Sequence, residues 1–129
     1  MSLGLYPQTQ PTEWSCSHAC VAMLLGRPVE EVITELGSDG GLTPLELMNV
    51  LTLYGINWTP LAEPARLWKG WQIATVPSLN LRAGLHSILI HWDGRHRSVL
   101  DPSPKIRYKT DGTDLEGWCS VILVEPLKA

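Results

Sequence analysis

The 129-residue sequence contains no phenylalanine and only three cysteines, Cys16, Cys20 and Cys119. An odd number of cysteines cannot all be paired in disulfides, and this spacing contains no C-x-x-C pair of the kind that binds zinc. Positive charge is scarce as well, because ten Lys and Arg stand against thirteen Asp and Glu without clustering anywhere. We therefore expect free thiols, no metal or other cofactor, and no nucleic-acid partner.

Long apolar runs are also missing from the chain. No segment approaches eighteen consecutive apolar residues, so we expect no membrane-spanning helix. The first residues lack the basic start and apolar stretch of a secretory signal, which predicts a cytoplasmic protein. Hydrophobic residues make up 44% of the chain and charged residues 18%, which is typical of a globular protein. Residues 1–129 are predicted to form a single domain with its own core.

Helix signals gather in the first half of the chain. Ser15 stands where an N-cap is expected, and Thr43, Pro44 and Glu46 combine an N-cap, a first-turn proline and a capping-box glutamate. Glycines stop each apolar pattern at a natural C-terminal position. The predicted helices span residues 15–26, 28–37 and 43–55, and the second is expected to have Pro28 as its first helical residue.

Strand signals dominate the second half, apart from one expected helical turn near 64–70. The predicted strands span about 56–61, 72–76, 85–92, 97–101, 105–109 and 119–125. Helices first and strands second indicate an α+β fold, in which N-terminal helices pack on a C-terminal antiparallel β-sheet.

One predicted hairpin brings a histidine close to an aspartate. Asp93 and Gly94 separate two apolar β runs and favour a two-residue turn, which would place His86 directly opposite Asp101. A four-residue loop would slide the pairing by two and leave the two side chains as diagonal neighbours on one face. Such pairs are more often structural than catalytic, so this pair alone does not indicate an enzyme.

Cys16 falls in the first turn of the first predicted helix. Unpaired N–H groups and the positive end of the helix dipole stabilise a thiolate there, and a nearby imidazolium lowers the pKa of the thiol further. Cys20 lies one turn further on and has lost this advantage. Cys20 and Cys119 are therefore expected to pack in the core, as free cysteines commonly do.

The order of these residues along the chain matches that of thiol hydrolases. A nucleophile Cys16, a base His86 and an orienting Asp101 form a Cys–His–Asp sequence whose gaps the fold would close. Such a site also needs a hydrogen-bond donor for the oxyanion. Gln10, shortly before Cys16, is the predicted donor, and Gln8 is the alternative.

The segment around Cys16 resembles the opening of the C39-type cysteine peptidases, best known as domains that cleave leader peptides beside ABC transporters. Gln10 corresponds to the oxyanion glutamine of that family and Cys16 to its nucleophile, followed by a similar helix up to Met23. Ser15 and Ser17 stand where the family usually has Asp and Gly.

The resemblance continues in order along most of the chain, from about residue 8 to 104. Residues 41–47 are similar to the family's next helix, His86 and its apolar strand to the catalytic histidine, and Asp101-Pro102 to its aspartate-proline. It implies a papain-like fold and a freestanding peptidase that cleaves amide bonds in a peptide or protein substrate. Cys16, His86, Asp101 and Gln10 would form the catalytic site.

Three other functions stay open from the residues alone. The same site could deamidate glutamine or cleave another amide, or the domain could bind peptides without catalysis. A metal site would need Cys16 or Cys20 together with His18 and His86. Because His18 points to a different side of the helix from Cys16, a shared metal is disfavoured. His18 is predicted to lie at the rim of the cleft, and Trp14 to form a wall beside Cys16.

Overall fold

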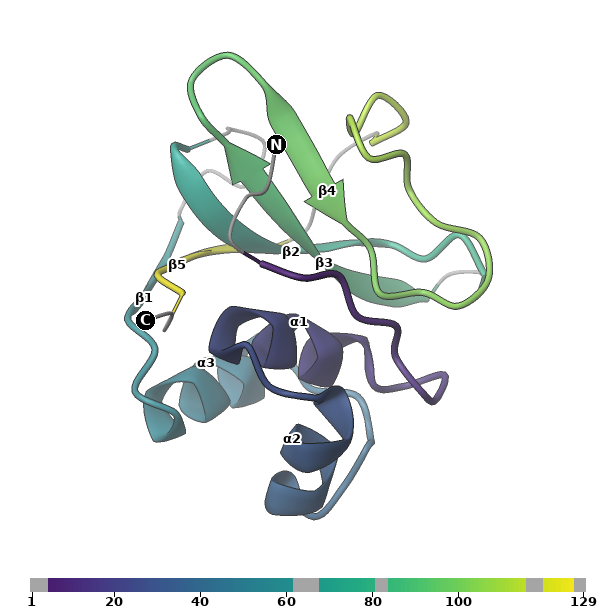
Figure 1. Ribbon diagram of the computed structural model, residues 1–129, viewed down its shortest axis with the longest axis vertical. Coiled ribbons are helices and arrows are strands. Elements are labelled where there is room, and N and C mark those ends of the chain that lie inside the picture. Colours follow the sequence, from purple (N-terminus) through teal and green to yellow (C-terminus); the bar gives the residue numbers. More distant parts are fainter. Residues whose placement is uncertain (1–4, 62–67, 81–83, 116–119, 127–129) are drawn as a thin grey trace.

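The computed structural model describes residues 5–61, 68–80, 84–115 and 120–126. These residues form three α-helices followed by five β-strands (Figure 1). The helices are α1 (Cys16–Leu25), α2 (Val29–Leu36) and α3 (Pro44–Leu53), and the strands are β1 (Trp58–Pro60), β2 (Gly70–Pro77), β3 (Leu85–Trp92), β4 (Arg97–Leu100) and β5 (Ser120–Val124). No helix in this described part of the chain is long and apolar enough to cross a membrane.

The strands form one sheet in the order β1-β5-β2-β3-β4, and every pair of neighbours is antiparallel. The three helices lie together on one side of this sheet (Figure 1). Helix α1 packs against β3, α2 packs against α1, and α3 contacts β1. The α+β arrangement predicted from the order of helix and strand signals is therefore what the chain forms.

Alternation along the central strands divides the apolar side chains between two clusters. Ile73 of β2 and Leu89 of β3 belong to the cluster that the helices cover. Their neighbours Ala74 and Ile88 belong to a second cluster on the other face. Because successive side chains of a strand point to opposite faces, β2 and β3 are buried on both sides.

The helix ends follow the local sequence signals closely at two places. Thr43 Oγ1 accepts a hydrogen bond from the Glu46 N–H at 3.2 Å, and Glu46 Oε1 accepts one from the Thr43 N–H at 2.9 Å. This is the predicted capping box, which satisfies two backbone donors at the start of α3. Helix α1 ends at Gly26, whose φ of 69° lies in the left-handed region that glycine adopts without strain.

Ser15 is the N-cap of α1, as predicted, but it makes no side-chain cap bond. Its hydroxyl instead donates to the Thr12 carbonyl at 3.0 Å and accepts from the Thr12 N–H at 3.1 Å, closing the turn before the helix. The predicted start of α2 is wrong in detail: Pro28 is the N-cap of α2 rather than its first helical residue, because its ψ of 140° is extended.

The strand predicted at 105–109 is also wrong, since this segment is irregular. Its backbone N–H groups bond to side chains instead of a neighbouring strand: Ile106 N–H to Asn80 Oδ1 at 3.1 Å and Tyr108 N–H to Asp101 Oδ2 at 2.8 Å. Strand β1 is shorter than predicted, spanning Trp58–Pro60. Most of the helical turn expected near 64–70 lies outside the described residues, as does Cys119.

Candidate active site

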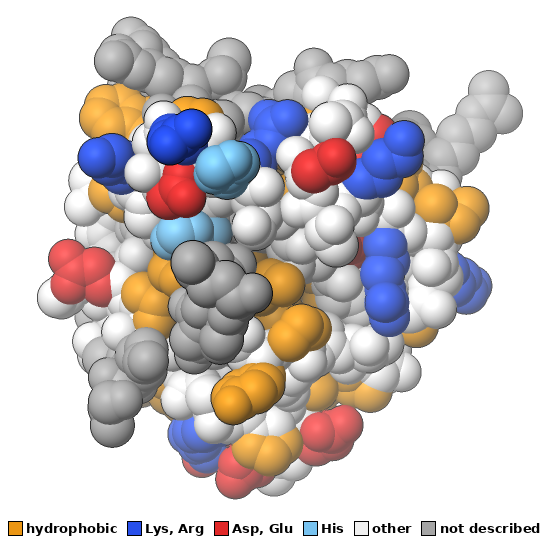
Figure 2. All heavy atoms as spheres, turned by 45° about the horizontal axis from the view of Figure 1, so that its top comes forward, with side chains coloured by type: hydrophobic (Ala, Val, Ile, Leu, Met, Phe, Trp, Pro, Cys, Tyr) orange, Lys and Arg blue, Asp and Glu red, His pale blue; other side chains and the backbone are white. Residues whose placement is uncertain are grey.

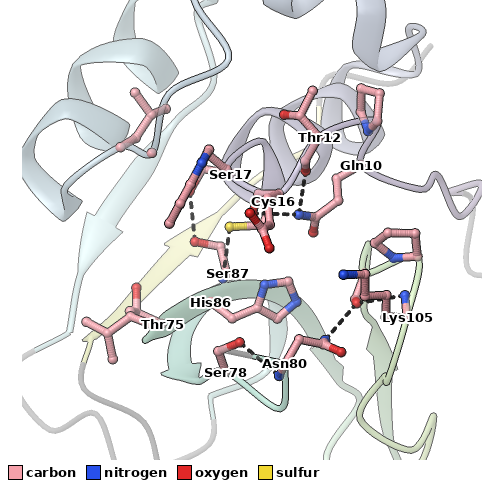
Figure 3. A pocket seen from close by; sticks show the side chains of 18 of the residues that line it. Gln10, Thr12, Cys16, Ser17, Thr75, Ser78, Asn80, His86, Ser87 and Lys105 are labelled. Carbon is pink, nitrogen blue, oxygen red and sulfur yellow. Dashed lines mark hydrogen bonds between the residues drawn. The ribbon is translucent and has the colours of Figure 1, made fainter. Parts of the chain in front are cut away.

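A cleft of about 730 Å³ opens at the N-terminal end of α1. Its lining comes from the segment before α1, the loop before α3, the adjoining ends of β2 and β3, and the loop after β4. Cys16, His86 and Gln10 all line it (Figure 3). The fold therefore gathers three of the four predicted site residues around one cavity, and Asp101 supports the histidine from behind.

Cys16 is the first residue of α1 and is half-buried. Its sulfur accepts a hydrogen bond from the Ser87 N–H at 3.5 Å, and the His86 ring lies next to it in the cleft (Figure 3). Burial alone raises the pKa of the Cys16 thiol, but the hydrogen bonds from His86 and Ser87 and the charge of His86 outweigh it. The pKa of Cys16 is therefore lowered, which favours the thiolate.

His86 and Asp101 form a buried pair. The ring Nε2 of His86 lies 2.6 Å from Oδ1 of Asp101, and only 10% and 2% of the two side chains are exposed. Asp101 also accepts hydrogen bonds from the Ser103 N–H at 3.0 Å and the Tyr108 N–H at 2.8 Å. Burial raises the pKa of Asp101, but His86 and these N–H donors lower it below its ordinary value, so the carboxylate is ionised.

The geometry of this pair corrects the predicted hairpin register. Trp92 pairs with Arg97 and Leu89 with Leu100, so the loop contains four residues instead of two. His86 and Asp101 are therefore not directly opposite, and they meet as the diagonal neighbours that a four-residue loop predicts. The longer loop forms because the Asp93 carboxylate accepts hydrogen bonds from the N–H groups of Arg95 and His96 at 2.7 and 2.6 Å.

The charges of the three residues support one another. Burial alone lowers the pKa of His86, but its hydrogen bonds to Asp101 and to Cys16 raise it to about 9. Because Nε2 is bonded to Asp101, Nδ1 is the ring nitrogen left for the thiol. A raised histidine pKa beside a lowered cysteine pKa favours a thiolate–imidazolium pair.

Gln10 is buried beside the first turn of α1 (Figure 3), with 4% of its surface exposed. Its Nε2 donates to the carbonyls of Thr12 at 2.9 Å and Glu13 at 3.2 Å. Its backbone N–H donates to the Pro102 carbonyl at 2.7 Å, which ties this segment to the loop after Asp101. Its Oε1 has no hydrogen-bond partner among the residues that the structure describes.

Gln8, the alternative donor, lies at a different place. Its Nε2 donates to the Arg27 carbonyl at 2.6 Å and its Oε1 accepts from the Val29 N–H at 2.8 Å. These bonds brace the connection between α1 and α2. Gln8 is not among the described residues that line the cleft, so Gln10 is the glutamine placed beside Cys16.

The other residues that the sequence singled out, Cys20, Trp14 and His18, lie in different environments. Cys20 is completely buried in the core as predicted, and burial raises the pKa of its thiol well above the ordinary value. Trp14 lines the cleft and is 54% exposed. The prediction that His18 lies at the rim is wrong, because only 1% of its surface is exposed. The reason is that α1 is enclosed on all sides, so even its polar residues are interior.

Sequence reasoning missed two features of the cleft. Ser17 and Ser87 form a hydrogen bond of 2.8 Å beside the Cys16 sulfur. Asn80 Nδ2 donates to Ser103 Oγ at 3.0 Å and to the Ile106 carbonyl at 2.9 Å, which joins the loop after β2 to the loop after β4. Ser87 could have been found as the neighbour of His86 on a strand, whereas no sequence signal pairs Asn80 with residues more than twenty positions away.

No group of three or more His, Cys, Asp or Glu side chains in the described ranges is arranged to hold a metal ion. On the face of the molecule shown in Figure 2, Lys and Arg side chains are interspersed with Asp and Glu. The expectation that the chain binds no nucleic acid stays a prediction.

No protein-family model and no curated protein matches this chain. Among solved structures, it is similar to the peptidase domain of Streptococcus ComA, a bifunctional ABC transporter involved in a quorum-sensing pathway, with a TM-score of 0.66, 14% identity, and coverage of 93% of this chain and 97% of that one. The peptidase domain of Streptococcus mutans ComA gives a TM-score of 0.61, 16% identity, and coverage of 93% and 98%. The chain has the fold of these peptidase domains, so the predicted papain-like fold and C39-type resemblance are confirmed at the level of fold.

Proposed function

We propose that this chain is a cysteine hydrolase that cleaves amide bonds in a peptide or protein substrate. Cys16 is the nucleophile, His86 the general acid and base, and Asp101 the residue that orients His86. The observation that carries the proposal is that Cys16 and His86 line one cleft side by side (Figure 3) while the His86 ring is held by the Asp101 carboxylate at 2.6 Å. The peptidase-domain fold supports the same chemistry.

The first step is attack of the Cys16 thiolate on the substrate carbonyl carbon. A carbon–sulfur bond forms and the carbonyl oxygen becomes an oxyanion. The His86 imidazolium then gives its proton to the leaving amine as the carbon–nitrogen bond breaks, leaving an acyl-enzyme. His86 is now a neutral base, which removes a proton from water as that water attacks the thioester. Breakdown of the second tetrahedral intermediate releases the acid and restores the thiolate–imidazolium pair.

The oxyanion needs donors close to the Cys16 sulfur. The Cys16 N–H in the first turn of α1 has no partner within the helix and points toward the N-terminal end. Gln10 supplies the second donor through Nε2, whose bond to the Glu13 carbonyl is the longer of its two at 3.2 Å. An N–H that shifts from this carbonyl to the oxyanion would stabilise the charge only as it develops, which is what raises kcat.

The cleft is large enough for several residues of a peptide. Its volume is about 730 Å³, and its lining includes Trp14 before α1 and Lys105 after β4 as well as Cys16. We infer that the substrate is a peptide or a flexible segment of a protein.

A direct test begins with covalent labelling of Cys16 by a peptide carrying an electrophilic carbonyl analogue, such as a peptidyl aldehyde or chloromethyl ketone. Peptide libraries then identify the cleaved bond by mass spectrometry. Cleavage yields a new amino terminus, whereas deamidation of glutamine releases ammonia and leaves the chain intact. Peptide binding without labelling or turnover in the wild-type protein would identify a catalytically silent domain and contradict the proposal.

A further inference from the structure

A buried pair of hydroxyl groups lies directly beside the Cys16 sulfur. Ser17 Oγ of α1 and Ser87 Oγ of β3 are 2.8 Å apart, and the two residues are only 2% and 6% exposed. Figure 3 shows both side chains meeting between the helix and the strand, next to the sulfur. The pair connects the helix that carries the thiol to the strand that carries His86.

Strand alternation explains why Ser87 faces this position. Leu89, two residues further on, belongs to the cluster that the helices cover, so Ser87 points toward the same helix layer. His86, the preceding residue of β3, begins from the opposite face of the strand. The sulfur is therefore contacted by two consecutive residues from two directions.

Ser87 faces the sulfur with two groups. Its N–H donates to Cys16 Sγ at 3.5 Å, and its side-chain hydroxyl lies beside the sulfur (Figure 3), where it is among the groups that lower the pKa of the thiol. A serine hydroxyl has one proton to donate and lone pairs to accept with. If the Ser17 hydroxyl donates to Ser87 Oγ, the Ser87 proton is free to point at the sulfur.

Resting on the proposed function, we propose that Ser87 is a positioning residue that stabilises the Cys16 thiolate through its hydroxyl, and that Ser17 fixes the direction of that hydroxyl. The two serines act as a relay: Ser17 donates to Ser87, and Ser87 donates to the sulfur. This arrangement involves hydrogen bonds alone, and no covalent bond forms or breaks in it. The backbone N–H and the hydroxyl of Ser87 both lower the pKa of Cys16 against the effect of burial.

The experiment follows alkylation of Cys16 by iodoacetamide against pH, read by peptide mass spectrometry so that Cys20 and Cys119 do not interfere. Ser87→Ala removes the hydroxyl but keeps the backbone N–H. We expect about tenfold slower alkylation at pH 6, with the same limiting rate at high pH, because one hydrogen bond to a charged group is lost. Ser17→Ala should slow the reaction less, and the double variant should be no slower than Ser87→Ala.

Ser98→Ala is the matched control. Ser98 is a half-buried strand serine that pairs with His91 on the β3–β4 ladder and is not a described lining residue of the cleft. It should leave the alkylation profile of Cys16 unchanged. Ser87→Thr, which keeps a hydroxyl, should restore part of the rate lost in Ser87→Ala, which a purely packing role would not produce.

The outcomes separate this inference from the proposed function. A wild-type profile that responds to His86→Ala but not to Ser87→Ala would overturn the role of Ser87 and leave the proposed function standing. A wild-type thiol of ordinary reactivity, indifferent to His86→Ala, would overturn both. If circular dichroism shows that Ser87→Ala does not fold, Ser17→Ala decides, and an unchanged profile in that variant would overturn the inference.

Discussion

His86 and Asp101 meet just beyond the last pair of the β3–β4 ladder, with 2.6 Å between Nε2 and Oδ1. The ladder fixes the two strands up to Leu89 and Leu100, and the carboxylate is then held by the N–H groups of Ser103 and Tyr108. Asp101 is therefore immobilised by backbone donors as well as by the histidine. A carboxylate held in this way can fix the tautomer and the direction of the ring.

Replacing Asp101 with Asn keeps the shape of the side chain and removes its charge. The bond from Asp101 is the largest cause that raises the pKa of His86 to about 9, so this pKa should fall. We expect kcat to drop by about a hundredfold or more, because the ring loses its orientation and its charged state. The limb of the pH–rate profile at high pH should move to lower pH. Asp111→Asn, at an exposed turn, is the control, and equal effects of the two variants would refute an orienting role for Asp101.

The reactivity of Cys16 should depend on His86 and on pH. The pKa of the wild-type thiol is lowered, so alkylation should already proceed at neutral pH and decrease only at acidic pH. In His86→Ala the burial that raises the thiol pKa remains while the main opposing interaction is lost. Alkylation at pH 7 should therefore fall and recover at alkaline pH. Identical profiles for the two proteins would show that the thiol and the ring are not coupled.

Cys16→Ala should abolish turnover without unfolding the protein. The thiol is half-buried at the edge of a cleft, so its removal leaves no closed cavity in the core. We expect a melting temperature within a few degrees of the wild type, measured by circular dichroism. Cys20→Ala is the matched control at the fully buried cysteine: it should lower stability but keep activity. Residual turnover in Cys16→Ala would mean that another group is the nucleophile.

Gln10→Ala should lower kcat by about 10²- to 10³-fold with little change in KM, the usual effect of removing one oxyanion donor. Gln10→Glu keeps the size of the side chain but replaces the donor with a carboxyl group, and it should be at least as damaging. Steady-state kinetics on the substrate found by library screening would measure both effects. A rise in KM at constant kcat would instead indicate that Gln10 only binds the substrate.

The left-handed glycine at the end of α1 gives a prediction about stability. Gly26 has a φ of 69°, and a Cβ added there would meet no atom within 4 Å, so Gly26→Ala tests backbone strain alone. We expect it to lower the free energy of unfolding by about 1 kcal/mol. The control is Gly41→Ala, because Gly41 has equal space and no left-handed φ. Urea unfolding would measure the stability of both variants, because a shift of the midpoint at an unchanged m-value reports a change of stability. Equal midpoints for the two variants would contradict the strain argument.

Local signals in the sequence were enough for much of the fold. The capping box of Thr43 and Glu46 fixes the start of α3, and the apolar alternation from Leu85 to Trp92 gives the bounds of β3 without error. These predictions succeed because hydrogen bonds within one turn and a two-residue period are set by neighbouring residues. Where a distant partner competes, as Asn80 does for the Ile106 N–H, the local strand signal at 105–109 fails.

The candidate site, like the fold, was predictable from the sequence only in part. The order of Gln10, Cys16, His86 and Asp101, and the position of Cys16 at a helix start, could be read from the sequence alone. The hairpin also limited His86 and Asp101 to the same face, although Asp93 hydrogen bonds set the register. The helix start and the hairpin are properties of short segments, because each depends on residues that are close together in the chain.

Only the tertiary structure decided which groups touch the sulfur. Cys16 and Ser87 are separated by 71 positions, and their contact exists because α1 packs on β3. The same packing encloses His18, places Gln8 between α1 and α2, and sets burial against hydrogen bonding in the pKa of Cys16. Burial and long-range hydrogen bonds depend on how helix and sheet surfaces meet, which no local pattern in the sequence specifies.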